Sequence, residues 1–184
     1  MIDGVTLVTS NSGKAREFAR LLGMDMAVTT LDLDEIQSLD VVTVVEHKAR
    51  DAYAKLRTPV LVDDSGLALT AWNGLPGALV AWFLKTVGLQ GLLNMAAGVA
   101  DRRATVTTAL GYADATGVHV VSGAVHGTLT TEPRGSNGLS YDAIFAPADS
   151  TRTFAEMSSE NKDAISPRRL AADALRAYLG LTDT

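Results

Sequence analysis

Two long strand-like runs late in the chain, residues 104–113 and 118–129, most constrain its fold. The segment Asp114-Ala115-Thr116-Gly117 between them is rich in turn formers, so the two runs predict a long antiparallel hairpin. Earlier in the chain, short apolar strands at residues 5–9, 26–31 and 60–62 alternate with helical apolar stripes at residues 14–22 and 44–56. A hairpin that follows several strand–helix units indicates an α/β protein with a mixed sheet.

Length and composition favour one domain over residues 1–184, although this length would also allow two lobes that share a cleft. The absence of cysteine excludes thiol catalysis, disulfides and Cys-ligated zinc. A net charge of −5 argues against a nucleic-acid or acidic-membrane partner, because such proteins need a basic surface. Neither a signal peptide nor a membrane-spanning apolar stretch is recognisable, so we expect a cytoplasmic location and no membrane partner.

The stretch from Val60 to Gly77 carries the most unusual polar pattern. An apolar strand, Val60-Leu61-Val62, runs directly into Asp63-Asp64-Ser65-Gly66. Ionised carboxylates are rarely buried unless they are paired or bind a metal, which favours a functional site. The same four residue types also form ordinary polar β-turns. On this stretch alone, both interpretations remain open.

The joint between the first strand and the first helix, Thr9 to Lys14, is a candidate phosphate site. Unpaired backbone N–H groups at a helix start carry positive partial charge and hold anions, and Lys14 adds a full charge there. The spacing is not that of a Walker P-loop. The alternative is that Asn11 or Ser12 only caps the helix while Lys14 and Glu17 form a surface pair.

Other segments add residue types that suit a nucleoside triphosphate. Glu35 lies in an acidic segment, residues 32–40, that is either a metal-ligand source or a solvated loop. Lys48 lies off the apolar stripe of its helix, where a lysine is usually only solvated. A turn-rich segment delivers Tyr141 beside Asp142, which suits either a clamp for a flat ring or a plain hairpin end. Lysines for phosphates, carboxylates for Mg²⁺ and an aromatic ring for a base are the parts of such a site.

Six blocks of the chain, in order, resemble the motifs of the inosine triphosphate pyrophosphatase (Ham1-like) family. They are Thr9-x-Asn11-x-x-Lys14-x-x-Glu17, Leu31-x-Leu33-x-Glu35-Ile36-Gln37, Asp63-Asp64-Ser65-Gly66-Leu67, Gly74-Leu75-Pro76-Gly77 with Trp82-Phe83, Tyr141-Asp142-x-Ile144-Phe145, and Thr153-Phe154-Ala155-Glu156-Met157 with Lys162 and Ser166-x-Arg168. The resemblance implies an elongated two-lobed α/β fold with a mixed sheet and a central substrate cleft. It also implies a homodimer that uses Mg²⁺ to hydrolyse purine nucleoside triphosphates, above all ITP, dITP and XTP, to monophosphate and pyrophosphate.

The resemblance also implies roles for individual residues. It makes Asp64 and Lys14 catalytic, with Asp64 orienting or deprotonating the attacking water, and it makes Glu35, Asp64 and Asp63 metal ligands. The residues implied to bind phosphate are Thr9, Ser10, Asn11, Ser12, Gly13, Lys14, Lys48, Ser65 and Lys162. Those implied to bind the base are Leu139, Ser140, Tyr141, Asp142, Ser166, Pro167 and Arg168.

Several positions depart from the family's pattern. Pro167 stands where a histidine is usual, Ala143 replaces a proline, and Ser140 replaces a glycine. Ala81 stands where the nearest branch carries a lysine, and Leu79 where a tyrosine is common. We expect the pyrophosphatase activity to be retained with a base preference altered through Pro167 and Ala81. The competing hypotheses are a catalytically silent nucleotide-binding homologue and a phosphatase that removes the terminal phosphate.

Overall fold

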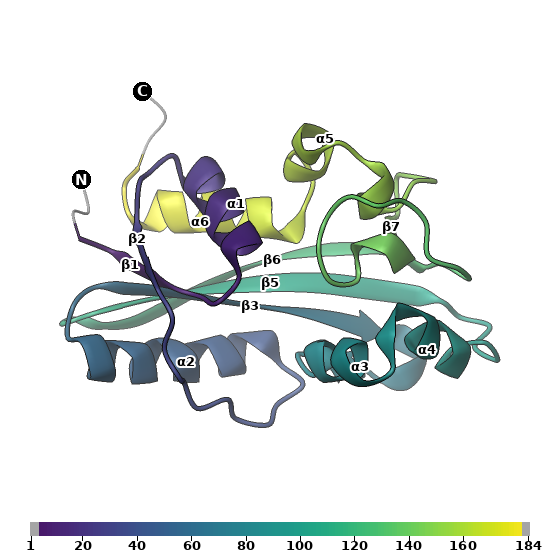
Figure 1. Ribbon diagram of the computed structural model, residues 1–184, viewed down its shortest axis with the longest axis horizontal. Coiled ribbons are helices and arrows are strands. Elements are labelled where there is room, and N and C mark those ends of the chain that lie inside the picture. The colour runs from purple at the N-terminus through teal and green to yellow at the C-terminus, as the bar shows by residue number, and fades with distance from the viewer. Residues whose placement is uncertain (1–3, 182–184) are drawn as a thin grey trace.

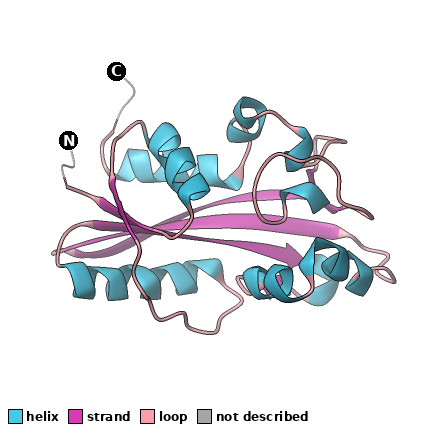
Figure 2. Ribbon diagram, viewed as in Figure 1, coloured by secondary structure: helices cyan, strands magenta, loops and turns pink. Residues whose placement is uncertain are grey.

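A mixed sheet of seven strands runs through the middle of the computed structural model, which describes residues 4–181 (Figures 1 and 2). The strand order is β2-β1-β3-β5-β6-β7, with β4 paired to β3. β1 is parallel to β2 and β3, and the remaining pairs are antiparallel, which confirms the mixed α/β class. The strands are β1 (Thr6–Val8), β2 (Ala27–Thr29), β3 (Val60–Leu69), β4 (Pro76–Gly77), β5 (Arg103–Asp114), β6 (Gly117–Leu129) and β7 (Phe145–Pro147).

Helices cover both sides of the sheet. In the view of Figure 1, α1, α5 and α6 lie above the strands, and α2, α3 and α4 lie below them. Their bounds are α1 Ser12–Leu22, α2 Val41–Leu56, α3 Val80–Thr86, α4 Gly88–Met95, α5 Ser159–Asp163 and α6 Pro167–Tyr178. In the part of the chain that is described, no helix combines the length and the apolar character that a membrane crossing requires.

The predicted hairpin is confirmed and holds the centre of the sheet. β5 pairs over its whole length with residues 117–128 of β6, and the turn between them uses Gly117 at φ 142°. Leu61 and Leu110 pack toward α1 and α6, whereas Val62 and Ala109 pack toward α2. The two cores on either side of the sheet fix which side each polar residue of β3 faces, because neighbouring residues of a strand alternate between faces.

The interpretation of residues 63–66 as a polar β-turn, which the sequence left open, is wrong. β5 pairs with every residue of β3, so the strand continues straight through the polar stretch to Leu69. On the other edge, β1 pairs only with residues 60–62 and β4 only with residues 67 and 68. Residues 63–66 therefore have one edge without a strand neighbour, and we call this gap the notch.

Gly66 is needed at the notch for close packing rather than for a turn. A Cβ atom at this position would lie 2.6 Å from Val41 Cγ2 and 3.0 Å from the Gly77 backbone. Both distances are below ordinary carbon contacts, so a larger residue would push α2 and β4 away from β3.

Candidate active site

A cleft of about 870 Å³ opens at the notch and contains most of the predicted site residues. The predicted residues that line it are Thr9, Ser10, Asn11, Lys14, Glu35, Lys48, Asp63, Asp64, Ser65, Leu139, Ser140, Tyr141, Asp142, Lys162, Ser166, Pro167 and Arg168. Two predicted residues, Ser12 and Gly13, are not part of this lining. Gly13 instead borders a smaller adjoining pocket between α1 and the segment 137–139.

The two aspartates of the notch face different lysines. Asp63 is almost fully buried, and its Oδ2 lies 2.7 Å from Lys14 Nζ. The Asp64 carboxylate projects to the α2 side, where its Oδ2 lies 3.9 Å from Lys48 Nζ, and its Oδ1 accepts a hydrogen bond from the Ser65 N–H. The strand alternation thus separates two adjacent carboxylates and gives each its own cation.

Glu35, Lys48 and Asp64 form a compact charged group. Glu35 Oε1 lies 2.8 Å from Lys48 Nζ, a full hydrogen-bonded ion pair, whereas the contact from Asp64 is too long for a hydrogen bond. Burial raises the pKa of the Asp64 carboxyl against the opposing effects of Lys48 and Lys14. Burial acts to lower the pKa of Lys48, but Asp64 and Glu35 outweigh it and raise that pKa. Asp64 is therefore the carboxylate of this group that would gain most from a further positive charge.

This group fits a magnesium ion better than a metal held by protein alone. Within residues 4–181, no three or more His, Cys, Asp or Glu side chains are arranged to hold a metal. Mg²⁺ binds through one or two carboxylates, substrate phosphates and water, and Glu35 and Asp64 supply two carboxylates beside one lysine.

At the start of α1, two of the backbone N–H groups that were expected to bind an anion are already hydrogen-bonded. Asn11 caps the helix, and its Oδ1 accepts from the N–H groups of Gly13 at 2.9 Å and Lys14 at 3.1 Å. These two amides are therefore not free for phosphate, although the side chains of Asn11 and Lys14 still face the cleft. The alternative pairing of Lys14 with Glu17 is wrong, because Lys14 contacts Asp63 and Glu17 is buried against Arg168.

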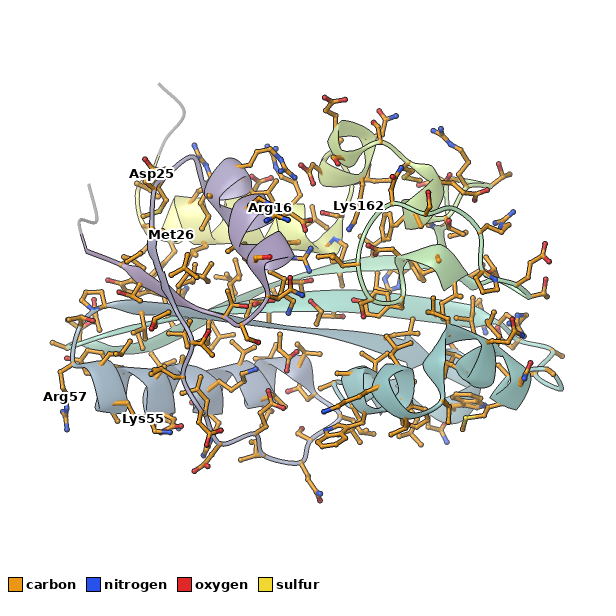
Figure 3. All side chains as sticks on the ribbon, in the orientation of Figure 1. Arg16, Asp25, Met26, Lys55, Arg57 and Lys162 are labelled. Carbon is orange, nitrogen blue, oxygen red and sulfur yellow. The ribbon has the colours of Figure 1, made fainter. Side chains whose placement is uncertain are left out.

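Asp142 fixes the loop that forms the wall opposite α1. Its Oδ2 accepts from the Leu139 N–H and lies 2.7 Å from Lys162 Nζ in a buried ion pair. Figure 3 labels Lys162 below α5, on the side of the sheet that carries α6. Lys162 was predicted to bind phosphate, and in the structure its ammonium group holds Asp142, in the segment that was predicted to bind the base. Ser140 in the same loop takes φ 56°, the left-handed region, which explains why a glycine would suit this position.

Tyr141 is buried in the same wall. Burial, helped by the Asp142 carboxylate, raises the pKa of Tyr141 well above its ordinary value, so its hydroxyl keeps its proton. The Ser65 hydroxyl lies 2.9 Å from that of Thr108, its partner on β5, so this contact joins two neighbouring strands on the floor of the cleft. Thr108 lines the cleft and was not predicted, since the sequence does not give the β3–β5 register.

Arg168 reaches the cleft from the first turn of α6 and forms a buried ion pair with Glu17 of α1. The Nη1–Oε2 distance is 2.5 Å, and the guanidinium carbon lies 5.5 Å from the centre of the Phe18 ring. Burial acts to lower the pKa of Arg168, but Glu17 outweighs it and raises that pKa. Arg168 Nε and Glu17 Oε1 are buried without a hydrogen-bond partner among the described residues. The first-signature spacing from Lys14 to Glu17 was the one signal that pointed to Glu17.

Lys85 of α3 also lines the cleft and was not predicted. The signal was present, because Lys85 follows Ala81 by four residues and lies on the same helix face. Ala81 itself lines the cleft, so the departure at this position and the unpredicted lysine belong to one surface.

The fold and the cleft define the class: a mixed α/β protein with paired lysines and carboxylates at the open edge of its central strand. The chain belongs to the Ham1 family, whose model matches residues 5–178, and this confirms the resemblance. Inosine triphosphate pyrophosphatase 2 of Trypanosoma cruzi (strain CL Brener) is 40% identical over 181 residues, which cover 96% of this chain and 92% of that protein. The dITP/XTP pyrophosphatase of Hyperthermus butylicus is 35% identical over 178 residues, 95% of this chain and 94% of that protein.

Solved structures agree with this assignment. The Ham1 protein of Staphylococcus aureus superposes with a TM-score of 0.84 at 29% identity, over 96% of this chain and 98% of that chain. A HAM1 protein from Coxiella burnetii gives a TM-score of 0.85 at 28% identity, over 97% and 99% of the two chains.

Proposed function

We propose that this chain is a nucleoside triphosphate pyrophosphatase that hydrolyses purine nucleotides with a 6-oxo base, foremost ITP, dITP and XTP, to monophosphate and pyrophosphate. The names of its relatives from Trypanosoma cruzi and Hyperthermus butylicus support this substrate class. The observation that carries the proposal is the group of Glu35, Asp64 and Lys48 at the notch, within one cleft with Lys14. The group provides carboxylates that can bind a metal ion and orient a water molecule, next to lysines that can bind phosphates.

The charge balance of the cleft supports a requirement for Mg²⁺. Five cationic side chains and five carboxylates line it, so the protein alone offers a polyphosphate little net attraction. Glu35 and Asp64 would hold the ion, which supplies the missing positive charge and neutralises phosphate oxygens when bound. Asp63 is the weakest of the three proposed ligands, because its Oδ2 already contacts Lys14.

The chain's own residues suit attack by water at the α–β linkage. Asp64 orients the water and accepts its proton as the new P–O bond forms, and the bridging P–O bond breaks to release pyrophosphate. Without a bound ion, burial raises the pKa of the Asp64 carboxyl, so a cation held beside it would favour its ionised form. Lys14 and Lys48 stabilise the negative charge that develops on the phosphates. Thr9, Ser10, Asn11 and Ser65 place hydroxyl and amide groups along the same wall.

The base is proposed to lie between the segment 139–142 and the start of α6. Arg168 is a donor and matches a 6-oxo group, whereas the 6-amino group of adenine is itself a donor. Pro167 contributes neither an imidazole nor an N–H at the first position of α6. We therefore propose a base preference that differs from that of relatives with a histidine there.

A substrate panel tests this function. Purified protein is incubated with Mg²⁺ and ITP, dITP, XTP, GTP or ATP, and monophosphate, pyrophosphate and orthophosphate are quantified separately. We expect pyrophosphate, with turnover of 6-oxo nucleotides above that of ATP and no turnover in EDTA. Orthophosphate with nucleoside diphosphate would favour the terminal phosphatase. Binding of ITP without any product would favour the silent homologue.

A homodimer, implied by the resemblance, and a cytoplasmic location, expected from the sequence, remain predictions. Light scattering coupled to size-exclusion chromatography tests the first, and fractionation of cells tests the second. A monomer at micromolar concentration would contradict the dimer.

A further inference from the structure

Lys85 is the one cation of the cleft lining that has no carboxylate within 4.0 Å among residues 4–181. The other four each contact an acidic side chain, in the pairs Lys14–Asp63, Lys48–Glu35, Lys162–Asp142 and Arg168–Glu17. The Lys85 ammonium instead lies 5.6 Å from the ring centre of Trp82 on the same helix. A ligand can therefore bind this ammonium group without first breaking an ion pair.

The difference matters for a polyanion. A cation that is already paired offers a phosphate little net charge unless its carboxylate moves away or binds a metal. Lys85 is exposed, and a lysine side chain has four rotatable bonds, so its ammonium can reach a ligand mainly at the cost of side-chain entropy.

The position of α3 indicates which part of a nucleotide Lys85 meets. Val80 is buried and anchors the start of α3, and Ala81, one turn before Lys85, lines the cleft beside it. Ala81 also borders a second pocket with Glu35 and Asp64, and that pocket contains none of the base-side residues 139–142 or 166–168. Ala81, on the same face of α3 as Lys85, thus adjoins the carboxylates of Glu35 and Asp64.

We propose that Lys85 binds the pyrophosphate half of the substrate, reaching across the cleft from α3 while Lys14 holds the phosphates from α1. The assignment rests on the proposed function for the identity of the substrate. It follows from the unpaired charge of Lys85 and from the position of α3, on the side of the sheet opposite α1 (Figure 1).

The test uses Lys85→Met, with Arg50→Met as a matched control. Arg50 is an exposed cation of α2 outside the cleft lining, and within residues 4–181 its one ion pair is with Glu46. Isothermal titration with pyrophosphate and Mg²⁺ measures binding without turnover, and steady-state assays with ITP give KM and kcat. We expect Lys85→Met to weaken pyrophosphate binding and raise KM about tenfold, with kcat changed less than about twofold. Inhibition by the monophosphate should stay unchanged.

A rescue variant separates charge from packing. Ala81→Lys in the Lys85→Met background returns an ammonium one turn earlier on the same helix face, and we expect it to restore much of the pyrophosphate binding. Equal pyrophosphate binding in Lys85→Met, Arg50→Met and the unmodified chain would overturn the assignment. Weaker binding in Lys85→Met alone, in a protein that hydrolyses no triphosphate, would uphold Lys85 while refuting the proposed function.

Discussion

The carboxylates of Asp63 and Asp64 leave β3 on opposite faces of the sheet, although the two residues are adjacent in the chain. One meets Lys14 beside α1, and the other lies near Lys48 of α2. The notch makes this possible, because β3 has no strand neighbour on that edge and both faces open into one cleft. The two aspartates can therefore have different roles.

Asparagine substitutions should separate the two aspartates. Asp64→Asn removes the proposed water base and should lower kcat by about 10²–10⁴-fold. Asp63→Asn leaves that base in place, frees the charge of Lys14 and removes one negative charge from the cleft, so it should act mainly by lowering KM for the triphosphate. Steady-state release of pyrophosphate from ITP measures both effects. Asp149→Asn, on an exposed loop, is the control, and equal losses of kcat in Asp63→Asn and Asp64→Asn would contradict the division.

Asp40 should stabilise α2, the helix that carries Lys48, as its N-cap. Its carboxylate accepts from the N–H groups of Val42 and Thr43, and Asp40→Ala should cost about 1 kcal/mol in urea unfolding at pH 7. The hydrogen bond from the Thr43 hydroxyl, with the two amides, lowers the pKa of Asp40. This contribution is present above the unfolded carboxyl's pKa and is lost as the pH falls through the depressed folded value.

The acid-dependent part of that prediction has its own control. Asp40→Asn keeps an N-cap acceptor but cannot titrate, so its stability relative to Asp40→Ala should not change between about pH 2 and pH 7. A constant difference between the unmodified chain and Asp40→Ala across that range would refute the role of the charge.

Gly66→Ala should destabilise the protein by about 1–3 kcal/mol, because the new methyl would overlap Val41 and crowd the Gly77 backbone. Val41→Ala in the same chain should restore part of the loss, since only the Val41 contact involves a side chain. Thermal unfolding of both variants measures this coupling. Gly98→Ala is the control, because nothing lies within 4 Å of its Cβ position.

Ser140→Gly should stabilise the protein by about 0.5 kcal/mol. The left-handed backbone at φ 56° costs a serine about 1 kcal/mol, and the greater freedom of glycine in the unfolded chain offsets part of that gain. Ser122→Gly, in the regular strand β6, should instead lose about 0.5–1 kcal/mol. Urea unfolding gives both values. If Ser140→Gly destabilised the protein as Ser122→Gly does, the explanation for Ser140 would be wrong.

Glu17→Gln should cost about 3 kcal/mol, because it leaves the buried guanidinium of Arg168 without its counter-charge. The double replacement Glu17→Met with Arg168→Met should recover most of that stability, since no unpaired charge remains, while selection of the base is lost. Glu46→Gln removes an exposed ion pair and should change stability by less than about 0.5 kcal/mol.

The local sequence pattern was sufficient to predict the fold class and the β5–β6 hairpin. The β5–β6 turn and the apolar stripes of α2 depend on neighbours in sequence, so periodicity located them. The course of residues 63–66 could not be inferred in this way. Whether Asp-Asp-Ser-Gly turns or extends depends on pairing with β5, which lies far along the chain, and the sequence carries no register signal for that pairing.

The site was predicted residue by residue through motifs rather than through geometry. The motifs brought Lys14, Glu35 and Asp64 to one cleft, which the structure reproduces. They did not indicate that Asn11 occupies the amides of Gly13 and Lys14, or that Lys162 holds Asp142. Such contacts depend on side-chain direction within a finished fold. Lys85 was missed because it stands one turn away from the position where a cation was sought.

The contact between Glu17 and Arg168 spans 151 positions of the chain. When the ribosome has synthesised β5 and β6, all the strands at the centre of the sheet exist. At that point α6, which carries Arg168, has not yet been synthesised. Until then Glu17 lacks its cation, so we expect the wall formed by the segment 139–142 and the start of α6 to be completed last. A nascent chain can therefore acquire the centre of its sheet before the residues proposed to select the base are in place.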